Sequence, residues 1–293
     1  MINVVLIFSI IILIIILFTI IVNVKCEYYR KQIPSRTIWI LWLQGWENIP
    51  KIVELNLLSW KKHNKNWNIE LVSEKNLNKY IDLPDYIIEK RKNKKIKAYS
   101  DIIRLALLNK YGGVWVDATV LCMHPLDNWI DDVIRPNGFW MYSSTFATKG
   151  KSRGPCIWFI ISMKPNYIIK KWYNEILKYW KENDTSEYFL TDKLFVDLKD
   201  SDTNFENEWN KSPVIWSKEG EGNASMLAGI VFEDIHSDKS KNAILNFKER
   251  CPYVVKLSRH KNLTENSLGM YAINESLYNN NLKFYRHEIV NYL

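Results

Sequence analysis

Residues 98–119 read AYSDIIRLALLNKYGGVWVDAT, and this stretch decides the fold. Its apolar spacing predicts a helix over residues 96–111, and the two glycines that follow predict a tight turn. The β-branched residues after the turn predict a strand over residues 114–121, and their first run stops on Asp117. A carboxylate at the carboxyl end of a strand lies where open α/β sheets bind ligands. Asp117 is therefore the first candidate for a functional residue.

Two further candidates lie on the predicted helix. Asp101 and Arg104 are three residues apart, so their side chains share one helix face and can act on one ligand. The simpler interpretation is an ion pair on a solvated face, which contributes about 0.2–0.5 kcal/mol. Gly112 and Gly113 allow the backbone to turn tightly and to approach a neighbouring strand or a ligand.

The segments around this motif alternate between strand and helix patterns. A strand is expected over residues 37–43, a helix over residues 50–63 that begins at Pro50, and a second strand over residues 67–72. Further strands are expected at residues 139–143, 156–163, 231–232 and 254–257, and further helices at residues 166–181 and 191–198. This alternation predicts a mainly parallel sheet with helices on both faces.

The ordered motif resembles a known class of enzymes. A Ser-Asp-x-x-Arg helix (residues 100–104), a Tyr-Gly-Gly turn (residues 111–113) and a strand that ends on Asp117 are similar to the capsular polysaccharide synthesis proteins. These are relatives of the glycosyltransferases with an Asp-x-Asp motif, of the family 32 type. The resemblance covers residues 36–130 well and the C-terminal half weakly. It implies a GT-A type nucleotide-sugar transferase fold over residues 37–293.

The resemblance implies transfer of a hexose from a nucleoside-diphosphate sugar to a glycan or lipid-linked acceptor, with retention of the anomeric configuration. Asp117 would orient the donor, and Asp101 and Arg104 would hold its sugar. The remaining donor-binding candidates are Trp42, Gln44, Trp46, Gly112, Gly113 and Thr119. An aromatic ring near residues 42–46 would stack on the base of the nucleotide.

A divalent cation is the cofactor that the resemblance implies, Mn²⁺ or Mg²⁺, because the leaving diphosphate carries negative charge. Asp117 is the expected ligand, and His260 is a weaker candidate. The chain departs from Asp-x-Asp, however, because Thr119 stands in place of the second carboxylate. Hard cations prefer carboxylate oxygens, so Thr119 weakens the case for a tightly bound metal. A catalytically degenerate, membrane-tethered glycan-binding protein is the alternative that this departure suggests.

The N-terminus carries an uncharged, apolar segment over residues 4–22. At about 1.5 Å per residue such a segment nearly crosses a hydrocarbon core of about 30 Å. We expect a transmembrane anchor over residues 1–24 and a juxtamembrane segment over residues 25–36. A cleaved secretory signal and a buried helix are the alternatives.

Charges around this segment predict the topology. Lys25, Arg30 and Lys31 follow it and no basic residue precedes it, which predicts a single-pass membrane protein with a cytoplasmic catalytic domain. A lumenal type II arrangement is the alternative. Asn-x-Ser/Thr sites would be glycosylated only in that arrangement; they include Asn183, Asn223, Asn262 and Asn274.

Composition and missing motifs exclude other classes. The formal net charge of +8 comes without a nucleic-acid recognition motif, so no nucleic-acid partner is expected. The four cysteines have no paired spacing, which excludes a zinc ribbon and gives no disulfide framework. A membrane scaffold whose basic face docks anionic lipid or a partner stays open as a third interpretation.

Overall fold

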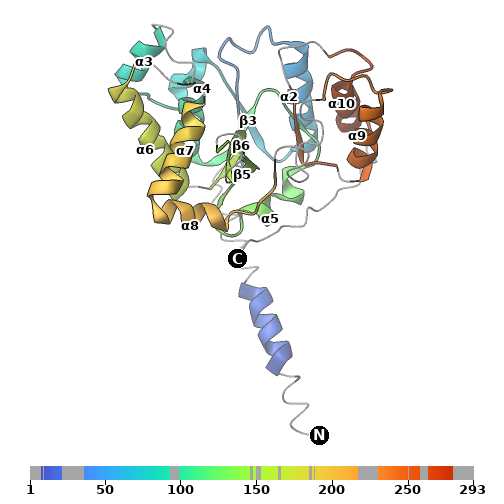
Figure 1. Ribbon diagram of the computed structural model, residues 1–293, viewed down its shortest axis with the longest axis horizontal. Coiled ribbons are helices and arrows are strands. Elements are labelled where there is room, and N and C mark those ends of the chain that lie inside the picture. The colour runs from blue at the N-terminus through green and yellow to red at the C-terminus, as the bar shows by residue number, and fades with distance from the viewer. Residues whose placement is uncertain are drawn as a thin grey trace.

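The computed structural model describes residues 8, 10–21, 36–92, 99–145, 148–149, 153–163, 166–184, 187, 189–216, 230–249, 251–257 and 263–279. Its centre is a five-stranded sheet with the order β2-β1-β3-β6-β5 (Figure 1). The strands are β1 (Thr37–Leu41), β2 (Asn68–Val72), β3 (Gly113–Asp117), β5 (Phe139–Ser144) and β6 (Gly154–Ser162). A mixed α/β fold with a mainly parallel central sheet is therefore confirmed.

Strand direction decides where the functional edge of the sheet lies. β1 is parallel to both β2 and β3, whereas β6 is antiparallel to both β3 and β5. In the β1–β3 pair, Leu41 is opposite Asp117. The chain that follows β1 therefore leaves the sheet at the same edge as Asp117, and this is the edge where such sheets bind ligands.

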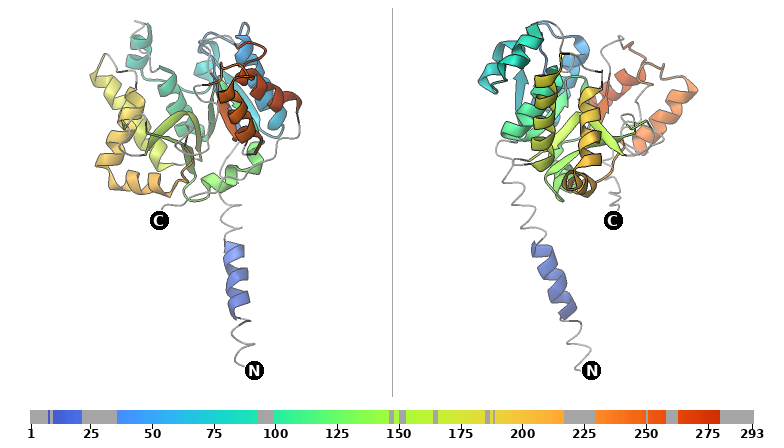
Figure 2. Two further views of the ribbon diagram at one scale, coloured as in Figure 1. Left: turned by 45° about the vertical axis from the view of Figure 1, so that its right-hand side comes forward. Right: turned by 60° about the vertical axis from the view of Figure 1, so that its left-hand side comes forward.

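Helices cover both faces of this sheet, as the alternation predicts (Figure 2). One face packs against α4 (Tyr99–Tyr111), α6 (Tyr167–Glu182) and α7 (Leu190–Ser201), with α8 (Thr203–Lys211) beside them. The other face packs against α2 (Lys51–His63) and α5 (Ile130–Ile134). The strands alternate accordingly: Trp39 and Trp115 face the first layer, and Ile38 and Val114 face the second. The smaller helices are η1 (Glu74–Lys79), α3 (Asp85–Lys92) and η2 (Leu126–Asn128).

The strand expected over residues 114–121 is in fact two strands. β3 ends at Asp117, the chain turns through Ala118 and Thr119, and β4 (Val120–Cys122) then pairs with β7 (Val254–Lys256) in a separate antiparallel sheet. The pattern of apolar residues does not predict this break, because the residues on both sides of it are apolar and buried. Its consequence is functional, since the turn brings residues from the C-terminal part of the chain beside Asp117.

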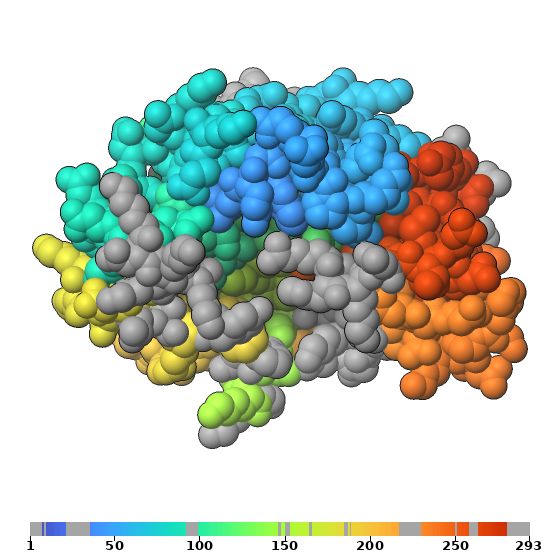
Figure 3. All heavy atoms as spheres, turned by 90° about the horizontal axis from the view of Figure 1, so that it is seen from above, coloured from blue at the N-terminus to red at the C-terminus, as the bar shows by residue number. Residues whose placement is uncertain are grey.

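The C-terminal part contains more helix than its sequence predicts. It holds α9 (Asp238–Glu249) and α10 (Leu268–Tyr278), while the strand expected at residues 231–232 is a turn. Both helices pack with β4 and β7 in a third apolar cluster. Figure 3 shows these orange and red helices beside the blue N-terminal part of the fold, and Lys62 of α2 donates hydrogen bonds to the carbonyls of Ser276 and Leu277 on α10.

The single-pass membrane localisation expected from the N-terminal segment is wrong. Within the described residues, no helix combines the length and the apolar character that crossing a membrane requires. The expected juxtamembrane residues 25–35 lie outside the described residues.

Gly113 has a structural task at the start of β3. Its φ is +99°, and a Cβ there would lie 2.6 Å from the Thr37 carbonyl oxygen and 3.1 Å from Trp39 Nε1. Gly113→Ala is therefore expected to destabilise the fold by about 2–3 kcal/mol, from backbone strain and steric overlap. Chemical denaturation measures this loss. The control is Leu58→Ala on the exposed face of α2, which should change stability by less than about 0.5 kcal/mol. A Gly113→Ala variant as stable as wild type would contradict the close approach.

Candidate active site

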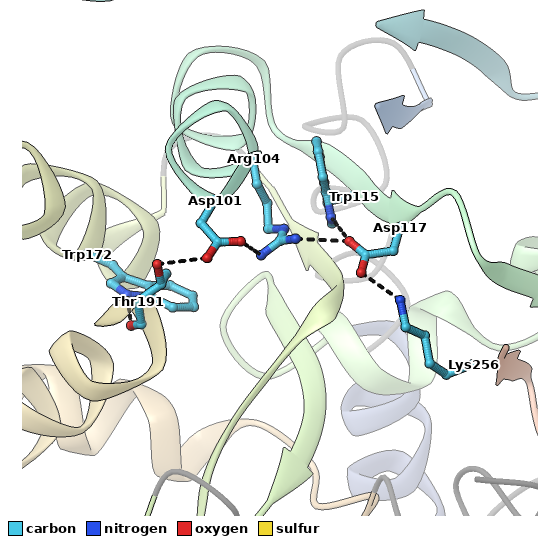
Figure 4. A network of polar contacts seen from close by, with 7 residues as sticks. All are labelled: Asp101, Arg104, Trp115, Asp117, Trp172, Thr191 and Lys256. Atoms are coloured by element: carbon cyan, nitrogen blue, oxygen red, sulfur yellow. Dashed lines mark hydrogen bonds and ion pairs between the residues drawn. The ribbon is translucent and has the colours of Figure 1, made fainter. Parts of the chain in front are cut away.

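Asp117 stands at the centre of a polar network at the end of β3 (Figure 4). Its Oδ1 accepts hydrogen bonds from Arg104 Nη2 at 2.9 Å and from Trp115 Nε1 at 3.0 Å. Its Oδ2 accepts from Lys256 Nζ at 2.7 Å. The Asp117 side chain remains 26% exposed, so this paired carboxylate still borders solvent.

Arg104 joins the two predicted acidic residues. Its side chain is only 5% exposed; Nη1 donates to Asp101 Oδ1 at 2.6 Å while Nη2 reaches Asp117. The guanidinium carbon also lies 4.9 Å from the centre of the Trp115 ring, within the range of a cation–π contact. The simpler interpretation of Asp101 and Arg104 as a solvated surface ion pair is therefore wrong, because the pair is buried and extends to Asp117.

Asp101 continues the network towards the helices that cover this face of the sheet. Its Oδ2 accepts a hydrogen bond from Thr191 Oγ1 at 3.0 Å, at the start of α7. The Thr191 carbonyl in turn accepts from Trp172 Nε1 of α6 at 2.9 Å. The three predicted residues thus form one connected unit that is fixed by α4, α6, α7 and β3.

The carboxyl groups of this unit differ in their pKa values. Burial alone would raise the pKa of Asp117, but the neighbouring Lys256 and Arg104 outweigh it and hold the pKa below its ordinary value. Burial raises the pKa of Asp101 above its ordinary value, although Arg104 and Thr191 oppose the shift. Asp117 is therefore the carboxylate that stays ionised most firmly.

Asp192 belongs to the electrostatics of this site and was not predicted from the sequence. Burial and the charge of Asp101 raise the pKa of Asp192 to about 7, while Arg104 opposes the rise. Its only signal in the sequence is an acidic residue in the first turn of a predicted helix, a position that is common for capping reasons alone.

Lys256 is the second residue that sequence reasoning missed. It lies on β7, and its ammonium group donates to Asp117 Oδ2 and, at 2.9 Å, to Thr119 Oγ1. No local pattern singles out this lysine, because its proximity to Asp117 depends on the pairing of β4 with β7. The predicted residue Thr119 is thus part of the site, as the second oxygen that holds Lys256.

The other predicted donor-binding residues fall into two groups. Trp42, Gln44 and Trp46 follow β1 and lie at the sheet edge of Asp117, where Gln44 is exposed and Trp46 Nε1 donates to the Val72 carbonyl. Gly112 and Gly113 lie at the opposite end of β3, four residues or about 13 Å away. The structure does not bring the two glycines to the site. Their positive φ values of 68° and 99° give them a conformational role.

The described residues fit a divalent cation poorly. Asp117 supplies the only carboxylate of the predicted motif, and both of its oxygens already accept hydrogen bonds from cationic side chains. Thr119 Oγ1 is occupied by Lys256. In the part of the chain that the structure describes, no group of three or more His, Cys, Asp or Glu residues is arranged to hold a metal ion. His260 lies outside the described residues, so its role as a ligand stays a prediction.

Comparison with known proteins identifies the family. The family model for capsular polysaccharide synthesis proteins matches residues 19–272, which is most of the chain. The chain belongs to this family. The family match extends far beyond residues 36–130, into the C-terminal half where the resemblance read from the sequence was weak.

Curated relatives of this capsular polysaccharide synthesis family member are fungal glycosyltransferases. The chain is 27% identical to O-glycosyltransferase braB of Annulohypoxylon truncatum over 50% of its own length and 38% of the relative. It is 26% identical to glycosyltransferase afumC of Aspergillus fumigatus over 50% of its length and 39% of the relative. The matched stretches thus span well under half of these relatives.

Solved structures give a weaker comparison. The PaToxG glycosyltransferase has 16% sequence identity and a TM-score of 0.41, with 88% of this chain and 91% of that chain covered. The catalytic domain of alpha-toxin from Clostridium novyi has 12% identity and a TM-score of 0.32, with coverages of 87% and 76%.

Proposed function

We propose that this chain is a glycosyltransferase that moves a hexose from a nucleoside-diphosphate sugar to a hydroxyl group of a glycan or lipid-linked acceptor. The observation that carries the proposal is the partly exposed Asp117 carboxylate at the carboxyl end of β3, held between Arg104 and Lys256. The family match and the names of the curated relatives support the same reaction class.

The geometry assigns different tasks to the three predicted residues. Asp117 borders solvent and would contact the donor directly, through the hydroxyls of its sugar or ribose. Arg104 is almost fully buried and uses both terminal nitrogens on carboxylates, so we assign it the positioning of Asp101 and Asp117. The residues after β1 would receive the base, because they leave the sheet at the same edge as Asp117.

The proposed reaction retains the anomeric configuration. The bond between the sugar C1 and the leaving phosphate oxygen breaks, and its electron pair stays on the diphosphate. The acceptor hydroxyl oxygen bonds to C1 on the same face, and the leaving phosphate accepts the proton of that hydroxyl. Cationic groups placed where this negative charge develops stabilise the transition state.

Binding of a nucleoside diphosphate is the first expected result. Titration with UDP and with GDP should raise the melting temperature in a saturable way, because a ligand that binds only the folded state stabilises it by about 2.7 kcal/mol at 100 times Kd. Thermal denaturation and calorimetry measure the effect. The matching nucleosides without phosphate serve as controls and should bind more weakly. If no nucleoside diphosphate shifts the transition at millimolar concentration, the chain is not a nucleotide-sugar enzyme. Binding without any donor hydrolysis would instead favour a glycan-binding protein.

A further inference from the structure

We infer that Lys256 supplies the fixed positive charge that stabilises the departing diphosphate, so that this chain transfers sugar without a bound divalent cation. The inference rests on the proposed function and deepens it. It concerns a residue on β7, in a part of the chain distant in sequence from the motif that contains Asp117.

The position of the ammonium group is the first argument. Lys256 Nζ lies between Asp117 Oδ2 at 2.7 Å and Thr119 Oγ1 at 2.9 Å. These two residues stand at the positions of the carboxylates in the Asp-x-Asp pattern, which the resemblance connects with the cation. A protein cation is thus already seated between the two side chains that would hold a metal ion, and Thr119 gives it a neutral hydroxyl to bind.

The free bonding capacity of Lys256 is the second argument. An ammonium group has three N–H donors, and the hydrogen bonds to Asp117 and Thr119 use two of them. The Lys256 side chain is 29% exposed, and that of Asp117 is 26% exposed. Among the described residues the third donor has no partner, and it lies at a border with solvent, where a phosphate oxygen can accept a hydrogen bond without displacing Asp117 or Thr119.

Strand pairing makes this geometry rigid. Lys256 is opposite Val120 in the β4–β7 pair, and the Leu257 amide donates to the Thr119 carbonyl at 2.8 Å. Val120 and Leu257 are both buried. The Lys256 backbone is thus fixed beside the turn that follows Asp117, and a donor fixed in advance stabilises developing charge with little reorganisation.

The charges of the network point the same way. Asp101 and Asp117 are paired with Arg104 and Lys256, and burial disfavours the charged form of the third carboxyl group, Asp192, by raising its pKa. A divalent cation at Asp117 would meet the ammonium group of Lys256 at short range and be repelled by it. A diphosphate would instead bring the negative charge that the third donor of Lys256 accommodates.

Lys256 keeps all its protons in the reaction. As the C1–oxygen bond breaks, the electron pair moves to the phosphate oxygen, and Lys256 donates a hydrogen bond to the diphosphate that carries this charge. The proton that the phosphate takes up comes from the acceptor hydroxyl. Lys256 therefore contacts the leaving group and acts by electrostatic stabilisation.

The test compares the full-length wild type with Lys256→Met and Lys256→Arg. Donor hydrolysis is measured for a panel of nucleoside-diphosphate sugars, in EDTA and with added Mn²⁺. Binding of UDP and of uridine is measured by calorimetry. The matched control is Lys241→Met, which removes an exposed lysine paired with Asp238 on α9.

Wild type should hydrolyse its donor in EDTA at a rate within about twofold of that with Mn²⁺. Loss of one charge-assisted hydrogen bond should lower the rate of Lys256→Met about 10- to 100-fold.

Binding separates a role in diphosphate recognition from a role in folding. Lys256→Met should bind UDP at least about tenfold more weakly, with its uridine affinity unchanged. Lys256→Arg should keep most of the UDP affinity and most of the uridine affinity. If Lys256→Met does not fold, Lys256→Arg and the EDTA experiment on wild type still decide the question. Wild-type activity that EDTA abolishes and Mn²⁺ restores would overturn the inference, and so would unchanged UDP binding by Lys256→Met. A wild type that neither binds nor hydrolyses any nucleotide sugar would instead overturn the proposed function itself.

Discussion

Asp117→Asn is expected to lower the turnover of sugar transfer at least about 100-fold, the scale of removing one electrostatic group from an active site. The substitution keeps the size of the side chain but removes the charge that Arg104 and Lys256 share. It also places an amide next to a cationic partner that needs an acceptor. Steady-state transfer kinetics measure the loss.

The fold should tolerate Asp117→Asn with a moderate loss of stability. One carboxylate contact with a buried arginine and one with a half-buried lysine are lost, which we expect to cost about 1–3 kcal/mol. Circular dichroism should match wild type. Asp238→Asn is the control, because Asp238 is almost fully exposed and its ion-pair partner within the described residues is the surface lysine Lys241. Transfer by Asp117→Asn at a rate close to wild type would remove Asp117 from the site.

Local sequence patterns were sufficient to predict the core of the candidate site. The apolar period of α4 places Asp101 and Arg104 on one helix face, and the glycine pair fixes the turn into β3. Both signals lie within twenty residues of Asp117. The structure brings the three residues together because α4 packs on the sheet face next to β3, and this packing follows from the same apolar pattern.

The missed residues depend on long-range pairing. Lys256 is 139 residues from Asp117 in the sequence, and only the antiparallel pairing of β4 with β7 joins them. The pairing was hidden because β3 and β4 read as one continuous strand. Its break at Ala118 and Thr119 carries neither glycine nor proline, which are the usual signals of a turn.

The N-terminal segment shows the limit of composition as evidence. An uncharged apolar run predicts a membrane helix by its length, but no helix within the described residues has the length and apolar character that crossing a membrane requires. Polar composition hides α8 and α9 for a different reason. Their sequences mix Asn, Lys and Ser with few apolar residues, so they resemble loops until neighbouring elements bury one face.

Arg104→Met is expected to destabilise the fold by about 3–5 kcal/mol, the typical cost of removing one partner from a buried ion pair. The guanidinium group is 5% exposed and binds two carboxylates, so its loss leaves Asp101 and Asp117 facing each other across an apolar side chain. Arg104→Lys keeps the charge but replaces a planar fork by one nitrogen, which cannot reproduce both contacts in the same geometry. We expect the lysine variant to lose less stability than the methionine variant and still to transfer sugar at least about tenfold more slowly, because Asp101 and Asp117 are no longer held together.

Arg91→Met is the matched control for the arginine variants. Arg91 is 37% exposed; its guanidinium lies 3.8 Å from Glu74 and 5.4 Å from the centre of the Tyr99 ring, and we expect the loss of these partly exposed contacts to cost about 1 kcal/mol. Denaturant midpoints give the stability of each variant, and transfer rates at saturating donor give the activity. The two measurements together separate an effect on the site from an effect on folding, since a lysine variant that is folded but slow has lost activity without losing its structure. Full activity of Arg104→Lys would show that one charge suffices at this position and that the fork between the two carboxylates has no part in catalysis.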